Sequence, residues 1–205
     1  MSMRRGVSRT LRVYTALRIG VSLTEMRIRT RTILRLRDTL LQGGRRPSSI
    51  VSTAYETLTR EALLSPEEAG ALTRVEPLAE CMFLMMSADG KVTDHERDAV
   101  RGAIRALTDD VLRSGTIHVM LESFEARMKE HGRDQRLHSI AEDLSEEPAE
   151  AEAAFSLAAA VALADDHVAD EENEFINRLA EWFGISEARS LAILDQLDED
   201  REAPE

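Results

Sequence analysis

The chain has 205 residues, of which 43% are hydrophobic but only 4% aromatic, and its formal net charge is −12. This length allows one sizeable core with an appendage, and the excess of helix-forming residues over β-branched runs favours an all-α fold. The charge is divided unevenly, because residues 1–50 contain 12 arginines and two acids, a net of +10, so that residues 51–205 carry −22. A body this acidic repels phosphate, which excludes a simple nucleic-acid-binding domain.

The sequence shows no sign of a membrane span or a secretory signal. No segment reaches the roughly 18 consecutive apolar residues of a membrane-spanning helix, and Arg12 and Arg18 interrupt the only candidate for a signal peptide. The single cysteine, Cys81, lies in an apolar run and is expected to be a small buried hydrophobe. These features predict a cytoplasmic protein, and peripheral attachment at the inner membrane face stays open.

Residues 1–46 are expected to form a basic amphipathic helical arm, with helix over about 8–42. Apolar residues recur there at three-, four- and seven-residue steps with arginines between them, and Gly43 and Gly44 end the pattern. Three roles stay open: binding to an anionic membrane surface, docking to a protein partner, or packing on the acidic body within one chain or a homodimer. The composition of the arm also resembles that of a mitochondrial transit peptide.

Residues 47–200 are expected to form a bundle of about seven to eight helices, followed by a charged tail at 201–205. Capping residues, prolines and glycines predict the helix bounds. In chain order these are about 49–64, a start at Pro66, then 75–88, 94–107, 109–130, 134–144, 148–165, 170–183 and 187–198. The stretches 78–86 and 151–164 are apolar nearly all round, so we expect both helices to be buried and packed together.

Each of these two buried helices leads into a short acidic loop, and the loops repeat one another 76 residues apart. Residues 88–96 read ADGKVTDHE and residues 164–172 read ADDHVADEE, so five of nine positions are identical and three of the five are acids. Apolar residues also follow both copies at matching places. The pattern predicts a duplicated bundle in which one helix–loop–helix unit occurs twice, at about 75–107 and 151–183.

The first loop matches only the second half of an EF-hand. Gly90, Val92 and Glu96 stand where the EF-hand loop has its glycine, apolar residue and final glutamate. The first and third ligand positions would be Met85 and Ser87, and methionine offers no oxygen to calcium, which wants roughly 6–8 oxygen ligands. A true EF-hand is therefore not predicted.

A buried helix, the acidic loop and an amphipathic helix, repeated once around a central helical insert, resemble the TerB family over about residues 50–200. These tellurite-resistance-associated domains are also similar to the N-terminal domain of membrane-anchored DnaJ-like co-chaperones. The resemblance implies an all-helical bundle without established catalytic activity, whose clustered acids bind a divalent metal or a partner. By position, the matching acids are Asp89, Asp94, Glu96, Asp165, Asp170 and Glu172. The second copy departs from the pattern at Asp166 and Ala169.

The same acids also have structural uses. Thr93 and Glu96 have the spacing of a capping box, Asp94 and Asp170 would lie in first helical turns, and Gly90 is expected to take a positive φ. If the two loops converge, however, their carboxylates repel one another unless a cation neutralises them. Hard oxygen ligands favour Ca²⁺, Mg²⁺ or Mn²⁺ over zinc.

Three functions remain after these observations. The first is a non-enzymatic, TerB-like binding module, associated with stress or tellurite resistance, whose loops bind a divalent cation or a basic partner and whose arm docks to a membrane or a protein. The second is a structural component of a larger assembly, in which the acids serve only as helix caps. A metal-dependent hydrolase is the weakest, because no nucleophile or phosphate-binding loop accompanies the acids.

Overall fold

The computed structural model describes residues 30–42, 64–88, 90, 92–164 and 170–202, and these ranges contain eight helices and no strand. The expectation of an all-α fold is confirmed. The helices are α1 (Thr30–Gln42), α3 (Pro66–Met86), α4 (Asp94–Leu107), α5 (Ser114–His131), α6 (Arg133–Leu144), α7 (Pro148–Ala162), α8 (Asp170–Trp182) and α9 (Glu187–Glu202). The predicted helix at 49–64 and the first part of the arm lie outside the described residues.

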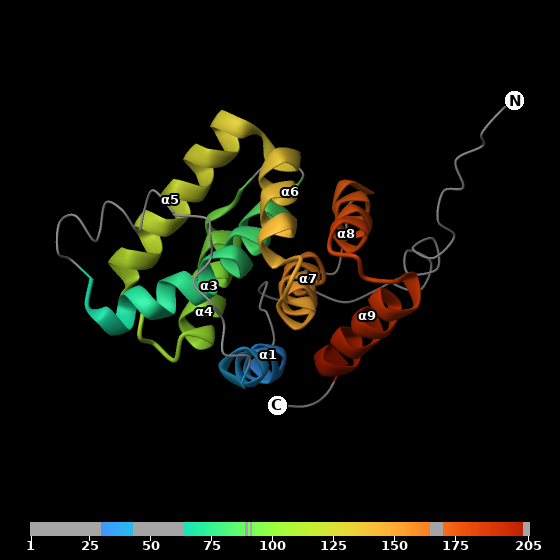
Figure 1. Cartoon of the computed structure of the whole chain (residues 1–205), viewed down its shortest axis with the longest axis horizontal. Coiled ribbons are helices and arrows are strands. Elements are labelled where there is room, and N and C mark those ends of the chain that lie inside the picture. Colours follow the sequence, from blue (N-terminus) through green and yellow to red (C-terminus); the bar gives the residue numbers. More distant parts are fainter. Residues whose placement is uncertain (1–29, 43–63, 89, 91, 165–169, 203–205) are drawn as a thin grey trace, which may run out of the picture.

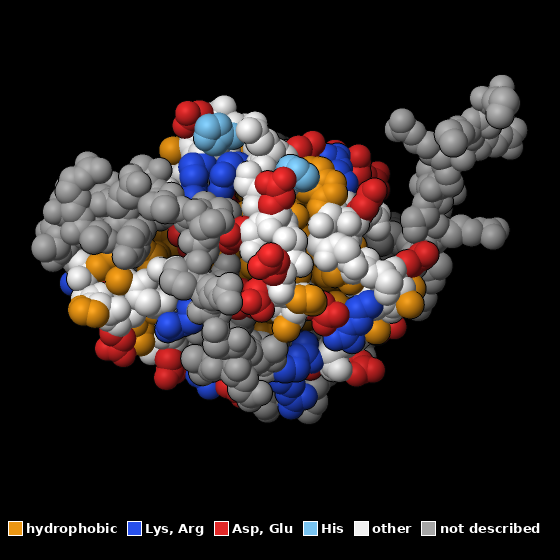
Figure 2. Space-filling view, viewed as in Figure 1, with side chains coloured by type: hydrophobic (Ala, Val, Ile, Leu, Met, Phe, Trp, Pro, Cys, Tyr) orange, Lys and Arg blue, Asp and Glu red, His pale blue; other side chains and the backbone are white. Residues whose placement is uncertain are grey.

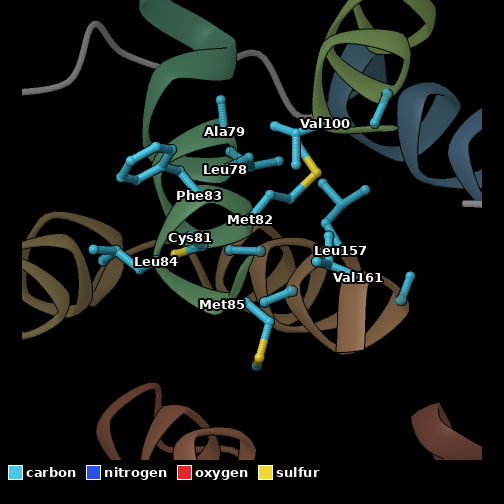
Figure 3. Packing of buried hydrophobic residues seen from close by; sticks show 14 of the residues in the cluster. Leu78, Ala79, Cys81, Met82, Phe83, Leu84, Met85, Val100, Leu157 and Val161 are labelled. Atoms are coloured by element: carbon cyan, nitrogen blue, oxygen red, sulfur yellow. The ribbon is translucent and has the colours of Figure 1, made fainter. Parts of the chain in front are cut away.

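The two apolar helices form the centre of the bundle, as predicted. Helices α3 and α7 make the most extensive helix–helix contact of the described chain, and Figure 1 shows α7 nearly end-on among its neighbours. Every residue from 78 to 86 is buried, Cys81 included. In Figure 3, Met82 points toward Val100 and Leu157, whereas Phe83 points to the other side of α3. Helix α3 therefore buries side chains in several directions at once.

Helix α3 is a single helix of 21 residues, although a break near Pro77 was predicted. The start at Pro66 was predicted correctly, because Ser65 and Glu68 form a capping box there. Pro77 lies inside the helix, where its ring removes one backbone hydrogen bond. The residues on both sides of Pro77 are buried, so the helix continues because tertiary packing outweighs the local cost of the proline.

Helix α5 begins at Ser114, five residues later than the start predicted at Asp109. Asp109 and Asp110 instead have positive φ values of 52° and 58°. The amide of Asp110 donates to the carbonyl of Arg105 at 2.8 Å, so these residues close the end of α4. Aspartate tolerates this left-handed conformation better than most residues, and a pair of acids was therefore misread as a helix start.

The remaining helices cover the central pair (Figure 1). Helices α4, α5 and α6 pack on α3, while α8 and α9 pack on α7. Helix α1 contacts α4, α7 and α9, and its Ile33 and Leu36 are buried. The described end of the basic arm thus lies on the acidic body of the same chain.

Helix α9 continues to Glu202, past the predicted end at 198. Asp200 is buried, accepts a hydrogen bond from Thr32 at 3.0 Å and pairs with Arg35 at 3.1 Å. These contacts with α1 hold the last turn of α9 in place. The region predicted to be a charged tail therefore begins in an ordered helix.

A cluster of four charged residues is buried between α3, α5 and α6. The Arg136 guanidinium donates to both carboxylate oxygens of Glu80, at 2.8 and 3.0 Å. Arg127 bridges Glu76 at 3.0 Å and Glu80 at 3.2 Å, and its guanidinium carbon lies 5.1 Å from the ring centroid of Phe124. The two negative and two positive charges balance, which is the condition for keeping such groups out of water.

Candidate functional site

The first acidic loop begins where α3 ends and finishes at the start of α4. The amide of Gly90 donates to the carbonyl of Ser87 at 3.1 Å, and Gly90 has a φ of 80°, as predicted. A residue with a Cβ atom is strained in that conformation, which explains the glycine. Asp89 lies outside the described residues, so its position as a ligand stays a prediction.

Glu96 is committed to the predicted capping box at the start of α4. Its Oε2 accepts from the amide of Thr93 at 2.6 Å and from the Thr93 hydroxyl at 2.8 Å, while the Glu96 amide donates to that hydroxyl at 3.3 Å. Asp94, the first residue of α4, is exposed. A cation at this loop would thus find an exposed carboxylate at Asp94 and the second oxygen, Oε1, of Glu96.

The second acidic loop is described only at its two ends. Asp170 is the first residue of α8 and is exposed, and Glu172 is half-buried in the same first turn. Residues 165–169, which include Asp165, lie outside the described residues. The helix dipole stabilises acids in a first turn by about 0.3–1 kcal/mol, so both carboxylates have a structural use whether or not they bind a cation.

The two loops have matching helix boundaries. Helix α3 ends at Met86 and α7 at Ala162, while α4 begins at Asp94 and α8 at Asp170. Both pairs differ by 76 residues, the offset at which the sequence repeats. The agreement supports the internal duplication, which itself stays a prediction because the second loop is described only in part.

Two arginines that the sequence analysis missed hold the ends of the central helices. Arg133 donates through Nη1 to the carbonyl of Ala88 at 2.7 Å and lies 3.4 Å from that of Ser87. Arg201 donates through Nη1 to the carbonyl of Leu163 at 2.7 Å. Leu163 is the counterpart of Ser87 in the second copy, 76 residues later. Each guanidinium thus places positive charge at the negative end of a helix dipole, directly before an acidic loop.

The sequence could have indicated that Arg133 has a partner on another element. Arg133 is the first residue of α6, where a helix dipole disfavours positive charge. A cation in that position indicates a partner elsewhere in the fold. Arg201 gave no comparable signal, because basic residues are common in the last turn of a helix.

The opposite charges of α4 and α5 also meet beside the first loop. Glu125 accepts from Lys129 at 2.7 Å and from Arg97 at 2.8 Å, and these hydrogen bonds, that of Lys129 first, lower the pKa of the Glu125 carboxyl. Ser87 donates to the sulfur of Met128 at 3.2 Å. The end of α3 therefore has polar contacts with both α5 and α6.

The described residues give no complete ligand set for a metal. They contain no group of three or more histidine, cysteine, aspartate or glutamate side chains arranged to hold an ion. Exposed acids are scattered over the face shown in Figure 2, with basic side chains between them. The carboxylates that are described suit a hard cation by their chemistry, and the six-residue set stays a prediction.

A pocket of about 180 Å³ lies away from both acidic loops. It is lined by residues of α1, the first half of α3, the end of α4 and the start of α7, among them Arg37, Val75, Asp109 and Glu150. The first loop follows the opposite end of α3, so the pocket is not part of the acidic site.

No helix in the described ranges combines the length and the apolar character that crossing a membrane requires. No curated protein and no solved structure shows significant similarity to the chain. The family model described as tellurite resistance protein TerB matches residues 76–194, which is more than half of the chain. This range begins within α3, ends within α9 and contains both acidic loops. The chain therefore belongs to the TerB family.

Proposed function

We propose that the chain is a non-enzymatic binding module whose two acidic loops bind a divalent cation. The observation that carries this proposal is the recurrence, at the same offset of 76 residues, of three acids together with the helix ends that flank them. Family membership supports a TerB-like module, and the tellurite-resistance association belongs to the description of the family.

The chemistry of the loops favours Ca²⁺, Mg²⁺ or Mn²⁺. The proposed ligands are carboxylate oxygens of Asp89, Asp94 and Glu96 in the first loop, with Asp165, Asp170 and Glu172 as their counterparts in the second. The same charges would repel an oxyanion such as tellurite. The loops would also suit a basic segment of a protein partner. Titration with metal ions and with a basic peptide distinguishes these two kinds of ligand.

Titration calorimetry with Ca²⁺, Mg²⁺ and Mn²⁺ tests the cation proposal on the full chain. We expect heat of binding and a rise in melting temperature at millimolar metal, because a ligand that binds only the folded state stabilises it by RT ln(1 + [L]/Kd). Asp94→Asn and Asp170→Asn should abolish or weaken the signal. Asp98→Asn is the matched control, since Asp98 is an exposed acid of α4 that pairs with Arg101 outside the loop.

Glu96→Gln separates capping from binding at one residue. Glutamine also forms a capping box, so this variant should keep its stability while it loses metal affinity. No heat and no thermal shift with any of the three metals would refute cation binding. Binding of a basic peptide by the wild type, lost in Asp94→Asn, would instead assign the loops to a protein partner.

A scaffold role without cation binding is the second candidate, and one observation favours it. The Glu96 carboxylate accepts from both the amide and the hydroxyl of Thr93, within the capping box. If capping is the only role of the loop acids, the module presents a rigid bundle surface to an assembly, and Asp94→Asn changes neither metal affinity nor the folded structure.

We also propose that residues 1–29 attach the module to an anionic surface. These residues contain seven arginines and one acid, and each basic residue near an anionic membrane contributes about 1 kcal/mol. Ile33 and Leu36 of α1 are buried on the body, so the proposal concerns the preceding residues. In co-sedimentation, the full chain should pellet with vesicles that contain phosphatidylserine but not with neutral ones. Equal pelleting by a variant that lacks residues 1–29 would rule this out.

A further inference from the structure

Arg133 lies at a junction of three helices. It is the first residue of α6, and its Nη1 donates to the carbonyl of Ala88 at the end of α3, at 2.7 Å. On its other side, its guanidinium carbon lies 5.4 Å from the ring centroid of Phe175, a residue of α8 that is 1% exposed. One side chain thus contacts both the helix that precedes the first acidic loop and the helix that follows the second.

The position of Arg133 is unfavourable for α6 itself. A positive charge in a first turn opposes the helix dipole, and Gly132 before it makes no side-chain cap. The favourable contacts are made with other helices: the carbonyl end of α3 attracts the charge, and the face of an aromatic ring attracts a guanidinium. The side chain therefore serves the connection between helices rather than the stability of α6.

The next residue of α6 strengthens the same connection. Asp134 accepts from Nη1 of Arg178 on α8, with both carboxylate oxygens at 2.9 Å. Arg178 in turn contacts Glu174 one turn earlier on α8. The first turn of α6 is thus joined to α8 by an aromatic contact and an ion pair, and to the end of α3 by a hydrogen bond.

We infer that Arg133 is a positioning residue that couples the first acidic loop to α8, and through the first turn of α8 to the end of the second loop. The inference rests on the proposed function only in treating the two loops as one binding site. A displacement of the last carbonyls of α3 moves the guanidinium, and the guanidinium is packed on Phe175. At the second loop, Arg201 donates to the carbonyl of Leu163 at the end of α7.

Hydrogen exchange of the full chain without added metal tests this coupling. In Arg133→Met, we expect the amides of α8 around Phe175 to exchange at least about five-fold faster, which corresponds to ~1 kcal/mol at 1.4 kcal/mol per factor of ten. Arg97→Met is the matched control, because Arg97 also lies beside the first loop but contacts Glu125 of α5 instead. It should leave the exchange of α8 unchanged.

Arg133→Lys keeps the test informative if the methionine variant does not fold. Lysine retains a charge and a donor for Ala88 but lacks the planar group that stacks on the ring, so the exchange of α8 should rise less than in Arg133→Met. Unchanged exchange of α8 in a folded Arg133→Met or Arg133→Lys chain would overturn the coupling. No metal is present in the exchange experiment. A result against cation binding would therefore come only from the calorimetric titration, and it would not affect the test of the coupling.

Discussion

Replacing Glu80 with alanine is expected to lower the free energy of unfolding by about 3–5 kcal/mol, because it leaves buried charges without a partner. Glu80 is 1% exposed and contacts two arginines, Arg127 and Arg136. Burial is the largest single effect on the pKa of Arg136 and lowers it, but the hydrogen bond with Glu80 and the negative charges of Glu80 and Glu76 together outweigh burial and leave that pKa raised. Arg136 thus stays charged in the folded state, and its desolvation is uncompensated once the carboxylate is gone.

Urea denaturation monitored by circular dichroism measures this loss. Asp98→Ala is the control, since it removes one member of an exposed ion pair on α4, and such pairs contribute about 0–1 kcal/mol. The double variant Glu80→Leu with Arg136→Met should recover part of the loss, because it removes both a buried negative and a buried positive charge. A loss below about 1 kcal/mol for Glu80→Ala would show that water reaches this cluster and that the balance of buried charges is not what holds it.

The sequence predicted the central helix pair because its signal does not depend on distant residues. A stretch that is apolar on all sides must be buried, and two such stretches of similar length pack together. The start of α4 was predicted for the same reason: Thr93 and Glu96 complete their capping box within four residues. Such features can be predicted because all the residues that determine them lie close together in the sequence.

The errors arose where a distant contact decides the conformation. Pro77 remains inside α3 because its neighbours are buried against other helices, and Asp200 is ordered because Thr32 and Arg35 of α1 contact it. The buried charge cluster was also missed, although Glu76 and Glu80 are spaced one helical turn apart in an otherwise apolar stretch. Two acids on the buried face of a helix indicate partners on another helix.

In the candidate site, too, the features set by local sequence were predicted and those set by distant contacts were missed. The acids could be located from the sequence because the loop occurs twice, and the described ones, such as Asp94 and Asp170, begin their helices as expected. The arginines at the ends of α3 and α7 come from α6 and α9, and the two are not counterparts in the repeat. Their role depends on the packing of the bundle, which the periodicity of one segment cannot supply.

Replacing Phe83 with alanine is expected to destabilise the protein by about 3–5 kcal/mol, the usual cost of removing a buried aromatic side chain. Phe83 is fully buried, and its ring centroid lies 5.9 Å from that of Phe124 on α5, with the ring planes tilted by 55°. The loss combines the removed apolar contacts with the cavity that remains between α3 and α5. Urea denaturation of Phe83→Ala beside Phe83→Leu, which fills more of the space and should cost less, measures this effect.

The cavity in Phe83→Ala is expected to loosen the acidic loop as well as the core. The amide of Ser87 donates to the carbonyl of Phe83 at 3.1 Å, and Ser87 also contacts Met128 of α5. Loosening of α3 from α5 therefore loosens the last turn before the loop, so amides 87–90 should exchange faster in Phe83→Ala than in the wild type, beyond the change in global stability. If they exchange no faster than global unfolding requires, then Arg133 and the capping box of α4 hold the loop independently of the core.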